Sequence, residues 1–266
     1  MGRVIVVTSG KGSVGKTTTT ANLGMALAQR NRKVVVVDAD FGLRNLDLLL
    51  GLENRVVYTA VDVLTGQCRL EQALVKDKRR ANLVLLPAAQ NRTKDSVNPA
   101  QMKQLIAALA KVFDYVLVDS PAGIEMGFQN AIAAATEALV VTTPEISAVR
   151  DADRVIGLLE ANNIKKTHLI INRLRPKMVA ANEMLSVEDV QEQLGIPLIG
   201  VVPDDEQVIV STNKGQPLVL SSEPTLAGSA FENIARRLDG EKVDFLDLTV
   251  KEGLLSKIKN FFTKAL

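Results

Sequence analysis

The sequence predicts an α/β fold: an open, doubly wound and mostly parallel sheet with helices on both faces. Two observations support this prediction. Short apolar runs recur along the 266 residues, and most of them are followed by a longer stretch with helical periodicity. This alternation is the pattern of parallel strands joined by right-handed helical crossovers. The apolar runs that we expect to be buried strands are residues 4–8, 34–37, 83–86, 116–118, 139–142, 168–171 and 198–202.

The predicted helices lie at residues 17–30, 99–112, 129–135, 149–162, 186–194 and 226–238. No change in composition interrupts the pattern before residue 238, so we expect residues 1–238 to form one domain. Residues 239–250 are polar and mixed, which favours a linker. Residues 251–266 carry a different pattern and form a separate predicted element.

Composition excludes several classes of protein. With 47% hydrophobic and 23% charged residues, the chain is typical of a folded protein with a large core. Its formal charge of +2 gives no protein-wide basic field for nucleic acid. The single Cys68 excludes a disulfide framework within the chain and a multi-cysteine metal site. No run reaches the roughly 18 apolar residues of a membrane span and no secretory leader is evident, so we expect an intracellular protein.

A phosphate-binding loop is predicted between the first strand and the first helix. Residues 10–17 match the pattern G-x-x-x-x-G-K-[ST] in the required strand–loop–helix context. The glycines let backbone N–H groups face phosphate oxygens, and the helix dipole adds positive potential behind them. We expect Lys16 to bind the β- and γ-phosphates and the Thr17 hydroxyl to bind Mg²⁺. The predicted nucleotide-binding residues of the loop are Gly10, Lys11, Gly12, Ser13, Val14, Gly15, Lys16, Thr17 and Thr18.

Aspartates stand at the ends of two further predicted strands. Asp38 and Asp40 follow residues 34–37, and Asp119 follows residues 116–118. Taken singly, each is equally well explained as a helix cap or a turn former. Their joint placement favours a functional role, because phosphate transfer needs carboxylates that hold a metal and position water. Together with the loop, they predict a P-loop nucleoside triphosphatase.

The loop resembles the deviant Walker A motif K-G-G-x-G-K-[ST] of the MinD/ParA ATPases, with Lys11 as the additional lysine. Residues 38–47, 119–125 and 143–154 are similar to the branch of this family that determines the site of the division septum. The similarity runs nearly end to end. It implies an ATPase that dimerises when it binds ATP and separates after hydrolysis to ADP.

The resemblance also implies roles for individual residues. Lys11 would reach across the dimer interface to the partner's phosphates, and Asp40 would orient the attacking water. The implied catalytic residues are Lys11, Lys16, Asp40 and Asp119, and the implied metal ligands are Thr17, Asp38 and Asp119. The implied adenine contacts are Asn172, Pro203 and Asp204, and Arg173 is a further implied nucleotide-binding residue. A strand-end asparagine and a Pro-Asp turn also occur in many proteins for structural reasons alone.

One residue departs from the family's motif, since Ser13 stands where the pattern has its second glycine. If this position needs a positive φ or a close backbone approach, the Cβ costs roughly 1 kcal/mol. We therefore expect the change Ser13→Gly to leave ATP binding unchanged or to tighten it.

Apolar residues near the end of the chain recur at helical spacing, with lysines on or beside the opposite face. The apolar stripe consists of Leu254, Leu255, Ile258, Phe261 and Phe262. A basic amphipathic helix of this kind is typical of an in-plane membrane anchor. The alternative is a helix that packs on the domain core or on a partner. The family resemblance favours the membrane, where two such tails on one dimer would gain roughly 10²–10⁴-fold in binding by avidity.

The function that the resemblance implies is an ATPase that cycles between the cytoplasm and the cytoplasmic face of the inner membrane and positions the septum. In a plastid-bearing source the stroma would replace the cytoplasm. The implied cofactors are ATP/ADP and Mg²⁺; the implied partners are a second copy in an ATP-dependent homodimer, a MinC-like division inhibitor, a MinE-like activator of hydrolysis and anionic lipids. No specific nucleic acid is expected.

Two alternatives remain open from the sequence. The first is a ParA-like partition ATPase that binds DNA through clustered basic residues, of which residues 76–80 are a small example. The second is a non-enzymatic, ATP-sensing membrane scaffold in which Ser13 has impaired hydrolysis.

Overall fold

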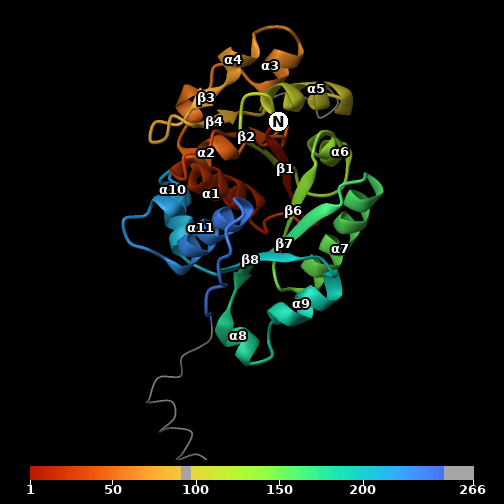
Figure 1. Ribbon diagram of the computed structural model, residues 1–266, viewed down its shortest axis with the longest axis vertical. Coiled ribbons are helices and arrows are strands. Elements are labelled where there is room, and N and C mark those ends of the chain that lie inside the picture. The colour runs from red at the N-terminus through yellow and green to blue at the C-terminus, as the bar shows by residue number, and fades with distance from the viewer. Residues whose placement is uncertain (91–96, 249–266) are drawn as a thin grey trace, which may run out of the picture.

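The computed structural model describes residues 1–90 and 97–248. Within these residues an eight-stranded sheet has the order β3-β4-β2-β5-β1-β6-β7-β8 (Figure 1). All neighbouring strands are parallel except β3 and β4, which pair antiparallel. The strands are β1 (Arg3–Thr8), β2 (Val34–Asp38), β3 (Val75–Lys76), β4 (Leu83–Leu86), β5 (Tyr115–Asp119), β6 (Glu137–Thr142), β7 (Lys166–Leu174) and β8 (Leu198–Pro203).

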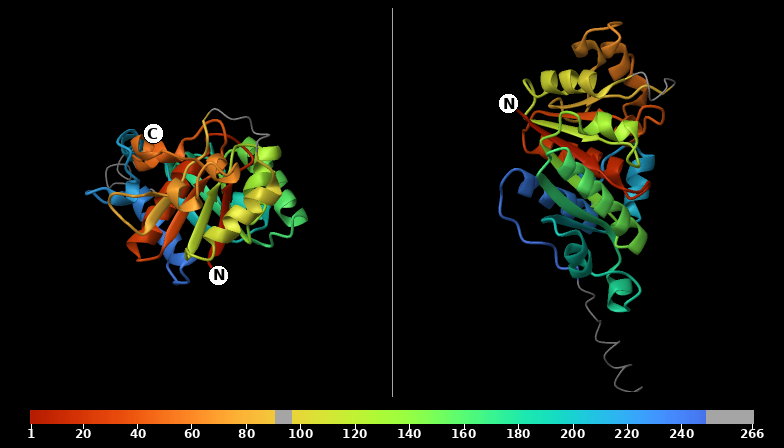
Figure 2. Two further views of the ribbon diagram at one scale, coloured as in Figure 1. Left: turned by 90° about the horizontal axis from the view of Figure 1, so that it is seen from above. Right: turned by 90° about the vertical axis from the view of Figure 1, so that its right-hand side faces the viewer.

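Helices cover both faces of the sheet (Figure 2). One face carries α1 (Lys16–Gln29), α2 (Leu46–Leu50) and α11 (Leu226–Leu238); the other carries α5 (Pro99–Leu109), α6 (Met126–Ile132), α7 (Ile146–Ala161) and α9 (Val187–Leu194). The remaining helical pieces are η1 (Glu53–Arg55), α3 (Ala60–Leu64), α4 (Leu70–Ala73), α8 (Pro176–Ala180), α10 (Gln207–Asn213) and η3 (Leu218–Leu220). The predicted doubly wound fold is confirmed.

The core consists of two apolar layers, one on each side of the sheet. In β1, Ile5 and Val7 point into one layer while Val4 and Val6 point into the other. Because both faces are covered, the strand is a continuous apolar run rather than an alternating one. The register aligns Asp119 with Val7 of β1 and with Asp38 of β2, so the loops after these three strands meet at one edge.

The structure departs from the predicted elements in a few places. The predicted helix at residues 129–135 begins three residues earlier and is α6, Met126–Ile132. The edge strand β3 and the short helical pieces α2, η1, α3, α4, α8, α10 and η3 are absent from the prediction. The alanines after Ile132 have high helix propensity, which extended the predicted helix beyond its real end.

The end of the described chain lies against the domain. Residues 239–248, which fall in the predicted linker, contain no helix or strand, and their Leu246 and Leu248 pack against the two core layers. The predicted membrane residues Leu254, Leu255, Ile258, Phe261 and Phe262 lie outside the described residues. Within the described part of the chain, no helix is long and apolar enough to cross a membrane.

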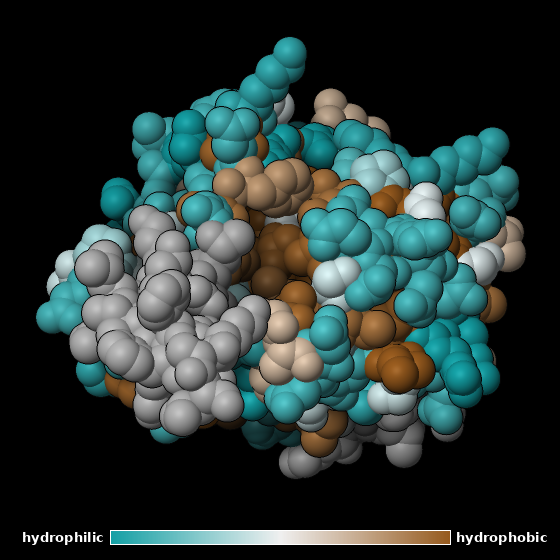
Figure 3. Space-filling view, turned by 90° about the horizontal axis from the view of Figure 1, so that it is seen from below, coloured by the Kyte–Doolittle hydropathy of each residue, from teal (hydrophilic) through white to brown (hydrophobic). Residues whose placement is uncertain are grey.

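Figure 3 shows the end of the molecule with α8 and α9, where apolar residues line a hollow between hydrophilic ones.

Candidate nucleotide site

The loop between β1 and α1 has two glycines that no other residue could replace without a shift of its neighbours. A Cβ on Gly10 would stand 2.1 Å from the carbonyl oxygen of Asp151. Gly15 has a φ of 101°, and a Cβ there would stand 2.2 Å from Nδ2 of Asn172. Ser13 has a φ of 63°. This residue therefore adopts the left-handed conformation on which its predicted strain depends.

Helix α1 begins directly after this loop and presents an uncapped N-terminus. Gly15 is its N-cap residue, no side chain accepts a hydrogen bond from the first turn, and that turn contains no acidic residue. The first turn lines a cavity of about 920 Å³ together with Ser13, Asp40 and Arg173. Unpaired N–H groups and the positive end of the helix dipole make this cavity suitable for phosphate.

Lys16 is almost completely buried, with 7% of its surface exposed. Its Nζ donates a hydrogen bond to Oγ of Ser9 at 2.8 Å, and the Ser9 hydroxyl in turn donates to the carbonyl oxygen of Lys11. Burial lowers the pKa of Lys16, and the negative charges of Asp119 and Asp40 act against this effect. The ammonium group is thus held among carboxylates at the base of the loop.

Asp38 and Asp119 are neighbours at the carboxyl ends of β2 and β5, and both are buried. Asp38 accepts backbone hydrogen bonds from Asp40 at 2.9 Å and from Leu46 at 3.3 Å. Burial and the charge of Asp119 raise the pKa of Asp38 to about 8. Burial raises the pKa of Asp119 to about 7, against the hydrogen bond from Thr17 and the charge of Lys16.

These residues fit a magnesium ion. Asp38 and Asp119 are adjacent carboxyl groups with raised pKa values, and the positive charge of a divalent cation between them would stabilise their ionised forms. Thr17, whose hydroxyl bonds to Asp119, adds a neutral oxygen. Among the described residues, no group of three or more His, Cys, Asp or Glu could hold a metal alone. Phosphate oxygens and water would therefore have to complete the shell, as is usual for Mg²⁺.

The predicted catalytic residues fall into two groups. Asp40 lines the phosphate cavity, and its charge acts on Lys16 and Asp119, so these three lie together. Lys11 points away from them. Its side chain is 44% exposed, and its Nζ lies 3.2 Å from Oγ of Ser147 and 3.6 Å from Oε2 of Glu145, at the start of α7.

The predicted adenine contacts line a second cavity of about 400 Å³, next to the first. They are Asn172, Pro203 and Asp204; the predicted nucleotide-binding residue Arg173 lines both cavities, as do Gly15 and Thr18. Asn172 donates a hydrogen bond to the carbonyl oxygen of Val14 at 2.7 Å, and Asp204 pairs with Arg175 at 2.7 Å. The side chain of Val14 is buried in the core, so this loop residue contributes its backbone to the site.

Two residues of the site were not predicted from the sequence. Ser9 holds Lys16, and Thr20 donates a hydrogen bond to Oδ1 of Asp119 at 3.2 Å. Thr20 lies one helical turn after Lys16 and therefore on the same side of α1, which is a spacing that could have identified it. Ser9 follows a buried strand and carries no comparable signal.

A glycine loop, a buried lysine and paired carboxylates at the carboxyl edge of a doubly wound sheet define a P-loop nucleoside triphosphatase. Residues 5–218 match the family described as the CobQ/CobB/MinD/ParA nucleotide binding domain. The chain belongs to this family, and its relatives place it in the MinD branch.

Three relatives illustrate the similarity. The septum site-determining protein MinD of Synechocystis sp. is 63% identical over 260 residues, which are 97% of this chain and 98% of the relative. A structure of the MinC:MinD cell division protein complex of Aquifex aeolicus is 48% identical with a TM-score of 0.86, and covers 93% of this chain and 100% of that one. The septum site-determining protein MinD of Pyrococcus horikoshii, in complex with Mg-ADP, is 33% identical with a TM-score of 0.81, over 90% and 96% of the two chains.

Proposed function

We propose that the protein is an ATPase that dimerises on binding ATP, attaches to a membrane as a dimer and helps to place the division septum. The observation that carries the proposal is the opposite placement of two lysines in one loop. Lys16 is buried among the carboxylates of its own site, whereas Lys11 is exposed outside it. A cation that leaves its own phosphate site can neutralise the phosphates of a second copy, as an arginine finger does.

The surface around the site supports contact with a second copy. Exposed apolar side chains follow strands β2, β5, β6 and β8, all at the edge that carries the phosphate cavity: they are Leu43, Leu48, Ile124, Met126, Ile146 and Ile209. Exposed apolar residues gathered around a polar cavity favour a protein interface. In the proposed dimer, they would surround two bound nucleotides and exclude water from them.

The chain's own residues would divide the chemistry of ATP hydrolysis among them. Lys16 and the first turn of α1 would bind the β- and γ-phosphates, and Asp40 would hold the attacking water in line with the γ-phosphorus. Thr17, Asp38 and Asp119 would hold Mg²⁺, which supplies positive charge to the phosphate oxygens when it is bound. Loss of the γ-phosphate would remove the charge that Lys11 contacts in the partner, so the ADP form would separate.

Membrane attachment and partners belong to the same proposal. The basic amphipathic pattern of residues 251–266 supports reversible binding to anionic lipid at the cytoplasmic face of the inner membrane, or in the stroma of a plastid. The Aquifex aeolicus neighbour is a MinC:MinD complex, which supports a MinC-like partner for this chain. A MinE-like activator rests on the family resemblance alone.

The partition alternative loses part of its support in the structure. Within the basic cluster at residues 76–80, Arg79 bonds to the buried carboxylate of Asp77 and donates to the carbonyl oxygens of Leu50 and Gly215. The guanidinium of Arg79 is therefore engaged within the chain, although 31% of its side chain is exposed. No observation favours DNA binding, and we propose no second function.

Sedimentation velocity with ATP tests the proposed dimer. We expect Asp40→Ala, which retains both lysines but loses the residue that orients water, to accumulate as a dimer with ATP. Lys11→Ala should remain monomeric under the same conditions, while Lys33→Ala, which removes an exposed lysine outside the site, should behave as the unmutated chain. Equal dimerisation of the Lys11 and Lys33 variants would contradict the proposal. Equal phosphate release from Asp40→Ala and the unmutated protein would favour the scaffold.

A further inference from the structure

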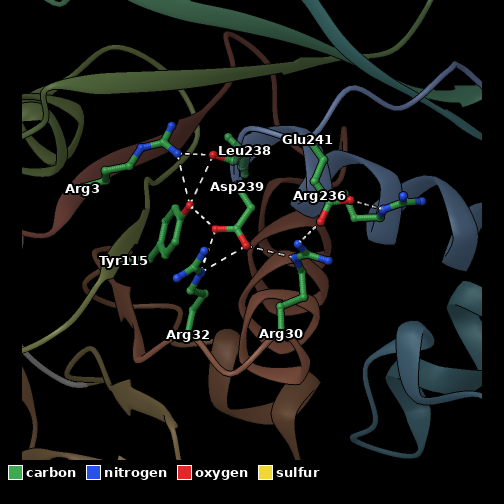
Figure 4. A network of polar contacts seen from close by, with 8 residues as sticks. All are labelled: Arg3, Arg30, Arg32, Tyr115, Arg236, Leu238, Asp239 and Glu241. Carbon is green, nitrogen blue, oxygen red and sulfur yellow. Dashed lines mark hydrogen bonds and ion pairs between the residues drawn. The ribbon is translucent and has the colours of Figure 1, made fainter.

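The connector, defined here as residues 239–248, is fixed to the domain by a cluster of arginines (Figure 4). Asp239 is its first anchor. Nε of Arg30 lies 3.1 Å from one carboxylate oxygen of Asp239, Nε of Arg32 lies 2.8 Å from the other, and the hydroxyl of Tyr115 donates to the latter at 2.9 Å. Only 4% of the Asp239 side chain is exposed. A buried carboxylate with three donors is a strong and well-defined attachment.

Two further anchors follow along the connector. Glu241 bonds to Arg30 and to Nε of Arg236, the latter at 2.7 Å. Arg237 donates to the carbonyl oxygens of Val243 at 2.9 Å and Asp244 at 2.7 Å. After these residues, Leu246 and Leu248 pack against the core. The connector is thus held along most of its length although it forms no helix or strand.

Arg237 holds the connector itself, and not only helix α11. Its guanidinium also donates to the carbonyl oxygen of Ile199 in β8, at 2.9 Å, and lies 4.2 Å from the ring centroid of Phe245. It therefore ties the connector to the last strand of the sheet. Stabilising α11 alone would require none of the contacts with residues 243–245, because that helix ends at Leu238.

The cluster also joins the connector to the helix that carries the phosphate loop. Helix α1 begins at Lys16, in the nucleotide site, and ends at Gln29, directly before Arg30. Its 14 residues span roughly 21 Å at 1.5 Å per residue. A packed helix of this length behaves as a rigid rod. The last described residues are therefore fixed relative to the edge of the sheet at which the proposed dimer would form.

We propose that Arg237 and Asp239 are positioning residues that fix the point from which the membrane-binding tail leaves the domain, so that an ATP dimer presents two tails at a defined separation. This inference rests on the proposed function. Its partner surface is an anionic lipid bilayer, and its effect is confined to the dimer. A single tail on a monomer gains nothing from a fixed origin, because there is no second binding event to bring close.

Chain length sets the size of the effect. With the connector held, the predicted helix at residues 251–266 begins three residues after Leu248; with the contacts of Arg237 lost, the free chain starts at the next anchor, Glu241, ten residues before that helix. The effective concentration of the second tail falls roughly as the −3/2 power of tether length, which gives about a sixfold loss. This loss should appear in the membrane affinity of the ATP form alone.

Vesicle binding by full-length variants tests the inference. The probe is vesicles made of equal parts phosphatidylglycerol and phosphatidylcholine, and the test variant is Arg237→Gln. The matched control is Arg80→Gln, which removes the same charge from an exposed arginine outside the connector and leaves the contacts of Arg237 in place. Relative to this control, we expect Arg237→Gln to bind about sixfold more weakly with ATP, to bind equally with ADP, and to retain ATP hydrolysis in the absence of vesicles.

A second variant distinguishes a positioning role from general damage. Insertion of eight Gly/Ser residues after residue 250 lengthens the free chain without touching the cluster, so it should reproduce the loss seen in Arg237→Gln. The two changes combined should lose less than the product of the separate effects. If Arg237→Gln binds vesicles as its control does, or if the insertion has no effect, the inference is wrong. If the unmutated chain shows no ATP-dependent binding at all, it is the proposed function that fails.

Discussion

The buried position of the Asp38 carboxyl group is better suited to a protein with a bound metal than to the ligand-free protein. Burial and the adjacent Asp119 raise its pKa to about 8, whereas an aspartate in an unfolded chain has a pKa of about 3.9. Between these values the native state retains a proton that the unfolded state releases. The contribution of this group to the free energy of unfolding therefore falls as the pH rises through this range.

We expect Asp38→Asn to make the melting temperature of the nucleotide-free protein less dependent on pH between about 5 and 8. The asparagine side chain is neutral in both states, so it contributes no slope. Asp119, with its pKa raised to about 7, should preserve part of the slope. Thermal unfolding of both proteins across this range is the measurement, and identical slopes would contradict the raised pKa. In this variant an amide nitrogen replaces one carboxylate oxygen and cannot accept the N–H of Leu46, which lowers the melting temperature at every pH. The pH dependence of the melting temperature is therefore the readout, and not its absolute value.

Ser13 gives a second prediction, about the phosphate loop. Its φ of 63° is a conformation that glycine adopts at lower cost. Ser13→Gly should leave the Kd for ATP unchanged or lower it by up to about fivefold, which corresponds to roughly 1 kcal/mol of relieved strain. Titration calorimetry measures the change. Asn182→Gly relieves a positive φ of 56° outside the site and serves as the control, with no expected effect on ATP. Tighter binding by the unmutated Ser13 protein would overturn the strain argument.

The elements that the sequence predicts well are those with enough residues to show a period or a continuous apolar run. Strands such as β2 and β5 are buried on both faces, and their Val-rich runs are recognisable without any neighbour. Strand β3 has two residues and α4 has four, which is too short for either signal. These pieces owe their structure to packing against the domain, which local sequence does not encode.

The predicted tail helix gives a prediction at the scale of an element. Leu254→Glu and Phe261→Asp each place a charge on its apolar stripe and should abolish co-sedimentation with anionic vesicles while leaving ATP binding intact. Thr263→Glu adds the same charge on the polar face and should cause a much smaller loss. Loss of ATP binding together with vesicle binding would indicate instead that the helix belongs to the domain core.

At the scale of the whole molecule, the site depends on contacts that link distant parts of the chain. The pattern of strands and helices predicts the fold class, but the strand order is set by packing in three dimensions. Asp38 and Asp119 become neighbours only because β2 pairs with β5, and Asn172 reaches the loop because β7 lies two strands from β1. Sequence motifs identified these residues as candidates. Their burial, and hence their raised pKa values, could not be predicted before the sheet was known.

The orientation of Lys11 is likewise a property of the assembled fold. The motif contains two lysines, and the sequence alone does not show that one is buried while the other contacts Ser147 in the first turn of α7. In the proposed function, this orientation of Lys11 lets the γ-phosphate hold two copies together, and the dimer would then carry two tails to one membrane. The central claim is therefore that the γ-phosphate controls membrane attachment.

Co-sedimentation with anionic vesicles, in parallel with ATP and with ADP, tests this claim most directly when phosphate release is measured in the same samples. The account predicts that the protein pellets with vesicles and ATP, stays in the supernatant with ADP, and releases phosphate in the ATP samples. Equal sedimentation with the two nucleotides, or none with either, would contradict it.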